Sequence, residues 1–174
     1  MATQIFLGEP PANIKRWIEE HAAPATHADT WYKYADDTEW RTVSISGTIS
    51  GSYDEDVEEF IPTTQIPNAE NVVSLEIGTN VTSIGNFAFC GGVLTNVMIP
   101  GSVTSIGDNV FDSCGRLMSV TIPDSVTSIG EDLFFGCLNL TSVTIVANGG
   151  NAENVKQMLI AAGIPENITW NMPS

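Results

Sequence analysis

The sequence predicts a mainly β protein with a small helical content, built as a short solenoid of parallel strands between two non-repeating ends. The first observation is a hexapeptide that recurs, as NVTSIG at 80–85 and as SVTSIG at 102–107 and 125–130. The second is that the sequence around this hexapeptide repeats at intervals of 22 or 23 residues. Self-similarity at such a period indicates stacked structural repeats.

Three full repeats occupy 77–98, 99–121 and 122–144, and a partial repeat at 71–77 precedes them. Each repeat holds two short segments, of the types SVTSI and LMSVTIP, and both are predicted strands. Proline ends the second strand because it has no N–H to donate to the ladder. One repeat cannot bury its own apolar residues, whereas repeats stacked at about 4.8 Å per rung bury them in continuous columns.

Three further positions of the repeat have predicted roles. The glycine that ends each hexapeptide is expected to turn the chain at a positive φ angle. The phenylalanine that follows is expected to fill the space between the two strands. The cysteine after it is expected to join a column of buried free thiols, because stacked Cβ atoms with parallel vectors do not suit a disulfide. These residues are Gly85, Gly107 and Gly130; Phe89, Phe111 and Phe134; and Cys90, Cys114 and Cys137.

The repeat follows the pattern I-P-x-S-V-T-S-I-G-x-x-x-F-x-x-C-x-x-L-x-S-V-T over residues 71–146. This pattern closely resembles the BspA-like leucine-rich-repeat family. The resemblance implies a right-handed parallel solenoid used for binding, as found on bacterial surfaces, in surface proteins of some protists and in proteins encoded by gut bacteriophages. It also implies an extracellular, cell-surface or virion location, and it supplies no catalytic residue.

The flanking segments predict two caps on the solenoid, which itself spans 47–148. The N-terminal module, 1–46, is expected to form a helix at 10–22 and then an aromatic β-hairpin in TWYKYADDTEWRTVSISG. The C-terminal cap, 149–174, is expected to form a helix with Asn151 as its N-cap. The segment NITW that follows is expected to return as a last strand.

The composition excludes several classes of partner. Six Lys and Arg against 21 Asp and Glu give a formal net charge of -15. Such a charge repels phosphate backbones and anionic lipids, so neither nucleic acid nor a membrane surface is an expected partner. No run of residues has the ~18–20 apolar side chains of a spanning helix, and the first residues lack the pattern of a signal peptide. The acidic run DEDVEE at 54–59 lacks EF-hand spacing and is interpreted as a solvated loop.

The sequence offers no catalytic or cofactor-binding pattern. The segment GGN at 149–151 lacks the lysine of a P-loop. His21 and His27 form only a weak metal pattern, and the cysteines lack C-x-x-C spacing. Adjacent carboxylates such as Asp36 and Asp37 point apart instead of flanking a substrate. We therefore expect no enzymatic activity, no metal and no cofactor.

Two sets of residues are candidates for contacting a ligand. Outward-facing residues of the longer strand would form polar rows across an exposed sheet, although such rows suit a plain solvated sheet equally well. The aromatic residues of the hairpin would form either a small core over the first rung or a recognition platform. The candidates are Ser74, Glu76, Asn96, Met98, Ser119, Thr121, Ser142 and Thr144 in the rows, and Trp31, Tyr32, Tyr34 and Trp40 in the hairpin.

Two hypotheses of function follow, and both are non-catalytic. The first is an adhesion or receptor-recognition module that binds a protein or glycan through the solenoid. The second is a structural component of a larger surface or phage-virion assembly, in which the N-terminal module docks to a partner or forms a homo-oligomer.

Overall fold

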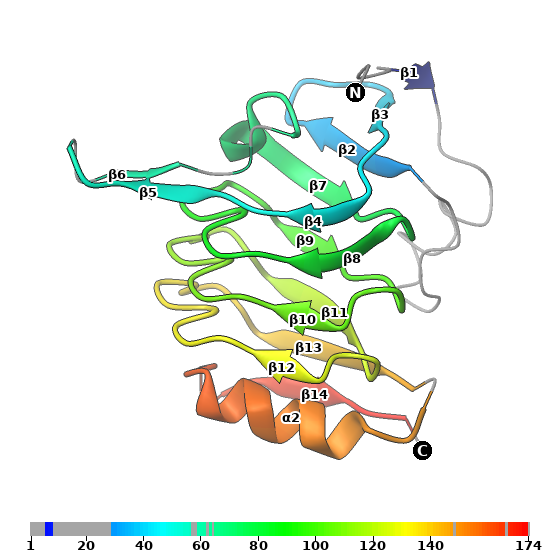
Figure 1. The fold of residues 1–174 in the computed structure, drawn as a ribbon, viewed down its shortest axis with the longest axis vertical. Helices are drawn as coiled ribbons and strands as arrows, with labels where there is room; N and C mark the ends of the chain where they lie inside the picture. The colour runs from blue at the N-terminus through cyan, green and yellow to red at the C-terminus, as the bar shows by residue number, and fades with distance from the viewer. Residues whose placement is uncertain are drawn as a thin grey trace.

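The computed structural model is a stack of short strands, with one α-helix among the residues that it describes (Figure 1). The expectation of a mainly β fold with parallel strands is confirmed. The helix expected at 10–22, together with His21 and His27, lies outside the described residues. The structure describes residues 6–8, 29–56, 59–61, 63, 65–147, 149–165 and 167–173.

The larger sheet has eight strands in the order β1-β3-β2-β7-β9-β11-β13-β14. From β7 to β14 the strands run parallel, and Asn96 pairs with Ser74 on one side and with Ser119 on the other. At the other end β2 and β3 form the predicted antiparallel hairpin, and β2 also pairs with β7. The strands are β1 (Phe6–Gly8), β2 (Thr30–Tyr34), β3 (Trp40–Val43), β7 (Val72–Glu76), β9 (Asn96–Met98), β11 (Ser119–Pro123), β13 (Ser142–Val146) and β14 (Thr169–Asn171).

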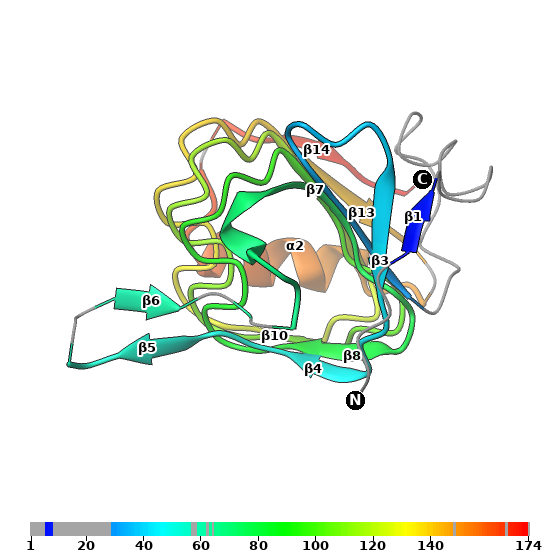
Figure 2. The same cartoon turned by 90° about the horizontal axis from the view of Figure 1, so that it is seen from above.

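The smaller sheet contains the recurring hexapeptide and forms another side of the stack (Figure 2). Its four parallel strands have the order β12-β10-β8-β4. Ser105 pairs with Ser83 and with Ser128, so the hexapeptides lie in register one above another. The strands are β4 (Gly47–Ile49), β8 (Val81–Ile84), β10 (Ser105–Ile106) and β12 (Ser128–Ile129).

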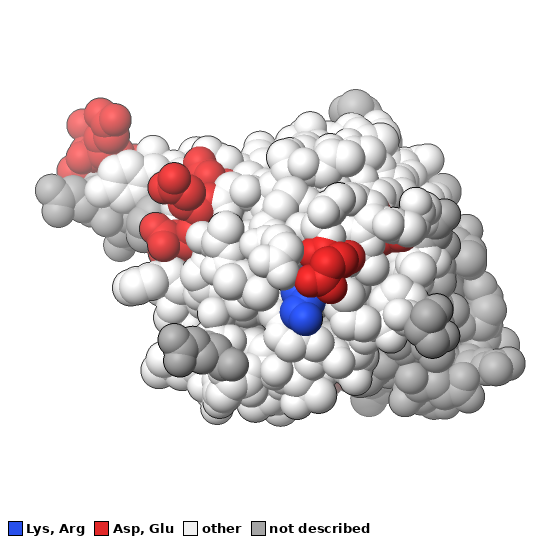
Figure 3. Space-filling model, turned by 90° about the horizontal axis from the view of Figure 1, so that it is seen from below, with Lys and Arg blue, Asp and Glu red and all other residues white. Residues whose placement is uncertain are grey.

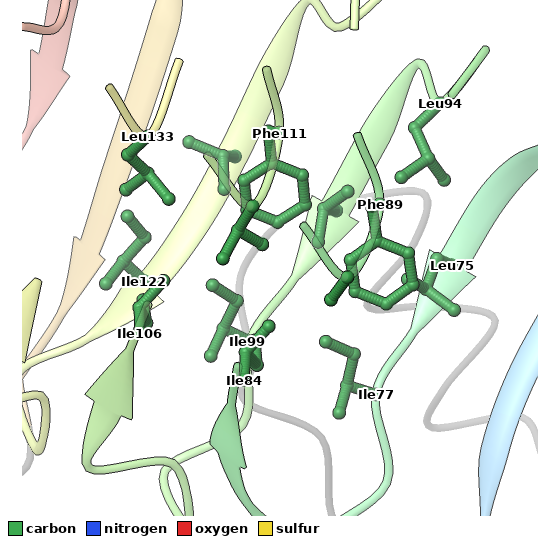
Figure 4. Close-up of a cluster of buried hydrophobic side chains, with 14 of the residues drawn as sticks. Leu75, Ile77, Ile84, Phe89, Leu94, Ile99, Ile106, Phe111, Ile122 and Leu133 are labelled. Carbon is green, nitrogen blue, oxygen red and sulfur yellow. The ribbon is translucent and has the colours of Figure 1, made fainter. Parts of the chain in front are cut away.

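The core between the sheets consists of columns of equivalent side chains (Figure 4). The rings of Phe89 and Phe111 stack with centroids 5.8 Å apart, and those of Phe111 and Phe134 stack at 5.6 Å. All three side chains are buried, which confirms the predicted phenylalanine layer. Stacked aromatic pairs contribute about 0.5–1.5 kcal/mol each beyond the area that they bury.

The three cysteines are free and buried, as predicted. The Cys114 thiol donates to the carbonyl oxygen of Phe89 at 3.0 Å, and the Cys137 thiol donates to that of Phe111 at 3.0 Å. Burial raises the pKa of Cys90 to about 11 and the pKa of Cys137 to about 12, and it also raises the pKa of Cys114. The thiols of Cys114 and Cys137 thus bond their repeats to the preceding ones.

These thiols should resist alkylation in the folded protein. At pH 8 we expect iodoacetamide to modify them at least roughly 100-fold more slowly than free cysteine, because the reactive thiolate is almost absent and access is blocked. In urea all three should react at the rate of an unstructured peptide. Mass spectrometry after timed quenching measures both rates. Rapid labelling of the folded chain would contradict a packed thiol column.

The glycines that end the hexapeptides are required for a different reason from the one predicted. Gly85, Gly107 and Gly130 do not have positive φ angles. Instead, a Cβ at Gly107 would lie 2.7 Å from the backbone nitrogen of Asn86, and a Cβ at Gly130 would lie 2.5 Å from the carbonyl carbon of Gly107. Neighbouring repeats are so close here that only glycine fits. The positive φ angles occur two residues later, at Phe87, Asn109 and Asp132.

The helix α2 (Ala152–Ala161) lies across one end of the stack, next to β12 and β13 (Figure 1). It buries Val155 and Leu159 against the core. Both α2 and the strand β14 after it form where the sequence predicted them. Asn151 occupies the N-cap position, but its side chain does not cap the helix and donates instead to the carbonyl oxygen of Val126 at 3.2 Å.

A buried aspartate holds the loop that leads into α2. The Oδ2 atom of Asp124 accepts the backbone N–H groups of Gly149 and Gly150 at 2.8 Å each and that of Asn151 at 3.3 Å. The preceding repeat has Gly101 at the same position. The aspartate is therefore specific to the repeat that meets the C-terminal segment, and nothing in the repeat pattern singled it out.

The other end of the stack carries a second two-stranded hairpin and a 3-10 turn. The strands β5 (Ser52–Asp54) and β6 (Glu59–Ile61) pair antiparallel and project away from the stack (Figures 1 and 2). The turn η1 (Ala69–Asn71) leads into β7. The acidic run 54–59, expected as a loop, thus includes residues of both strands of this hairpin.

Candidate functional site

The outward face of the larger sheet contains the predicted rows in the expected register. The first row joins Ser74, Asn96, Ser119 and Ser142, and all four side chains are half-buried. The Ser119 hydroxyl donates to Oδ1 of Asn96 at 2.6 Å. The Asn171 amide donates to the Ser142 hydroxyl at 3.1 Å. This row is therefore accessible in part and is already hydrogen-bonded along the sheet.

The second row is mostly inaccessible, which corrects the expectation of an exposed sheet. Glu76, Met98 and Thr121 have exposed fractions of 1%, 0% and 6%, and among the four members only Thr144 is half-buried. Alternation along a strand determines the face on which a side chain lies. It does not determine whether the chain also covers that face. Three of the eight row candidates therefore cannot contact a ligand in this structure.

The aromatic candidates of the hairpin were predicted to share one role, but Tyr32 and Tyr34 lie in different surroundings. Tyr32 is buried in the core opposite Leu75, and burial raises the pKa of its hydroxyl, so it is not part of an exposed platform. Tyr34 is half-buried, with its ring 5.6 Å from that of Tyr32. Trp31 and Trp40 lie in β2 and β3, and their side chains are outside the described part of the structure.

Tyr34 belongs to a charged cluster that holds the hairpin in place. The Arg41 guanidinium donates to both carboxylate oxygens of Asp37, at 2.8 and 2.7 Å, and lies 5.1 Å from the centre of the Tyr34 ring. Hydrogen bonding to Arg41 holds the pKa of Asp37 at about 2, below its usual range. The Tyr34 hydroxyl donates to the carbonyl oxygen of Pro67, just before η1. These contacts hold the hairpin in its position, so little of the Tyr34 side chain is left to contact a ligand.

A regular row of exposed side chains runs along the smaller sheet, where sequence reasoning placed no candidate. We call it the threonine face, and it consists of Thr82, Thr104 and Thr127, all of them exposed. The Thr127 hydroxyl donates to the carbonyl oxygen of Thr104 at 3.1 Å. The Thr104 hydroxyl donates in the same way to the carbonyl oxygen of Thr82 at 3.5 Å. The protons of these hydroxyl groups are used in bonds along the row, so lone pairs of their oxygens remain available to a ligand. The signal was present in the sequence as the identical threonine of each hexapeptide.

The described residues contain no cluster suited to metal binding. No group of three or more His, Cys, Asp or Glu side chains among them is arranged to hold a metal ion. Among the described helices, none has the length and apolar character needed to span a membrane.

Comparison with known proteins gives one match. The family model described as BspA type leucine-rich repeat region matches residues 60–158, in six copies. No curated protein and no solved structure matches the chain. The match covers every strand from β7 to β13 and includes the threonine face, whereas β4 of the smaller sheet lies before it.

Proposed function

Because the chain belongs to the BspA-type leucine-rich-repeat family, we propose that it is a non-catalytic module for adhesion or receptor recognition. This family of repeats suggests a protein-interaction module, and its members are typically surface-associated. We further propose that the partner is a protein or glycan at a cell or virion surface.

The observation that carries the proposal is the threonine face. Its three threonines are exposed, in register and spaced by single rungs, about 4.8 Å each. A row of exposed hydroxyl oxygens can accept hydrogen bonds from N–H donors of a protein or from hydroxyl groups of a glycan. The larger sheet supports a smaller contact, through Ser142 and Thr144, since much of its outward face is covered.

The proposed architecture is a right-handed solenoid closed by the N-terminal module 1–46 and by the C-terminal segment 149–174. The pairing of β2 with β7 and the packing of Val155 and Leu159 against the core support these two closures. An interaction surface on such a stack is rigid before it binds, so little ordering entropy opposes binding.

The replacement of Thr104 and Thr127 by lysine tests this surface. We expect the double variant to lose binding by about tenfold or more, because two long charged side chains would stand on the contact face. Binding of labelled protein is measured against a panel of whole gut-type bacteria and host matrix proteins. Circular dichroism confirms folding of each variant.

Asn154→Lys with Gln157→Lys is the matched control, because it also places two lysines at exposed neutral residues. Both residues lie in α2, outside the threonine face and the larger sheet. This variant should bind as the unchanged chain does. Equal binding by the Thr104 and Thr127 variant would exclude the threonine face. No binding by any form, together with self-assembly in sedimentation, would favour the structural-component hypothesis.

A further inference from the structure

The hairpin β5–β6 leaves the stack in a fixed direction, because its base is bonded on both sides. The Gly51 N–H donates to the carbonyl oxygen of Asn86 at 2.9 Å, and the Thr63 N–H donates to that of Ala88 at 2.8 Å. A Cβ at Gly51 would lie 2.4 Å from the carbonyl oxygen of Phe87. The base of the hairpin is thus hydrogen-bonded to the loop at 86–88 in the first full repeat.

The hairpin also contacts Phe87, a residue whose backbone is strained. Its φ angle is 58°, in the left-handed region, where the next two repeats have Asn109 and Asp132. Asparagine and aspartate tolerate this conformation, whereas a bulky side chain is strained in it. The Phe87 ring contacts the ring of Tyr53 in β5, with centroids 6.4 Å apart. The strained residue is therefore one that positions the hairpin.

A cavity of about 280 Å³ opens where the hairpin joins the stack. Its apolar walls come from Ile61, at the end of β6, and from Ile66, Pro67 and Ala69. Ile61 is 38% exposed, and Glu70, also in the lining, is exposed. The cavity is large enough for one medium-sized apolar side chain and is open to solvent beside the hairpin.

The hairpin next to this cavity is acidic. Residues 52–61 contain no Lys or Arg, and Asp54, Glu55 and Asp56 follow one another at the outer end of β5. Figure 3 shows acidic atoms gathered on the projecting segment at the upper left, whereas most of the facing surface is uncharged. Since Ser52 pairs with Ile61, Asp54 lies two residues from the edge of the cavity, or roughly 7 Å along the strand.

We propose that the cavity and the acidic hairpin together bind an extended segment of a partner protein. The segment carries one apolar side chain, which enters the cavity, and Lys or Arg two to four residues away, which contacts Asp54, Glu55 and Asp56. A second copy of this chain is a poor occupant, because its net charge of -15 repels the hairpin. This site is separate from the threonine face and does not depend on the proposed function.

The experiment selects ligands from a displayed library of random 12-residue peptides on the full-length chain at low salt. Selected sequences should combine an apolar residue with Lys or Arg two to four positions away. Their affinities are then measured by fluorescence anisotropy with the synthetic peptides. The double variant Glu55→Lys and Asp56→Lys should bind them about tenfold more weakly, and added salt should weaken binding to the unchanged chain.

A control with the same charge change is Glu131→Lys with Glu153→Lys, two exposed acids away from the hairpin. It should retain affinity within about twofold, since neither residue belongs to the hairpin or lines the cavity. Ile61→Ser should remove the preference for an apolar residue while the basic preference persists. If the selected peptides lacked this pattern, or if both charge variants lost affinity equally, the proposal would be overturned. Concentration-dependent self-association that blocks the peptides would also overturn it and would identify a second copy as the occupant.

Discussion

Phe111→Ala is expected to lower the free energy of unfolding by about 3–5 kcal/mol. The Phe111 side chain is fully buried, and its ring stacks between those of Phe89 and Phe134. Truncation removes both stacking contacts and leaves a cavity that the neighbouring repeats cannot close without losing their register. Since each repeat contacts mainly its neighbours, a defect in the middle repeat weakens both halves of the stack. Urea unfolding followed by circular dichroism measures the change.

Phe135→Ala is the matched control, because the same substitution is made at a side chain that is 65% exposed. Its effect should stay within about 0.5 kcal/mol. Phe111→Leu should fall between the two, since leucine fills much of the volume but does not stack. If Phe111→Ala and Phe135→Ala had similar effects, the phenylalanine column would not be a main source of stability.

Repetition explains why much of the fold could be predicted from the sequence. Equal residues at equal positions require equal surroundings, and only stacking in register provides them, as for Ser105 between Ser83 and Ser128. The strands, the phenylalanine layer and the free thiols all follow from that requirement. The C-terminal helix was predictable for a second reason, since its apolar residues have helical spacing and Gly163 and Pro165 follow it.

The features that escaped prediction are those whose surroundings are not repeated. Asp124 contacts the loop before α2, and Phe87 contacts the projecting hairpin, so neither has an equivalent in another repeat. The burial of Met98 and Thr121 likewise depends on what covers the sheet, which the alternation of a strand does not encode. For this reason the better candidate site lies on the smaller sheet, where Thr104 and Thr127 are exposed.

Gly107→Ala is expected to destabilise the protein by about 2–3 kcal/mol, as overpacking does in a close-packed interior. The added methyl group would lie 2.2 Å from Oδ1 of Asn86 and 2.7 Å from its backbone nitrogen. The amide side chain can rotate away, but it would then lose its bond from the Asp108 N–H, now 3.0 Å long. The backbone atoms cannot move without separating two repeats, so the sheets on both sides would be strained. Urea unfolding of the purified variant measures the loss.

Gly115→Ala separates this steric effect from the general cost of replacing glycine. Gly115 lies in the same repeat, its φ angle is not positive, and a Cβ there would meet no atom within 4 Å. Alanine at Gly115 should therefore be neutral or stabilise by up to about 1 kcal/mol, because it restricts the unfolded chain. If both alanine variants were neutral, the repeats would have room to separate at Gly107. If both were equally destabilised, backbone flexibility and not close approach would be the reason for glycine at the end of each hexapeptide.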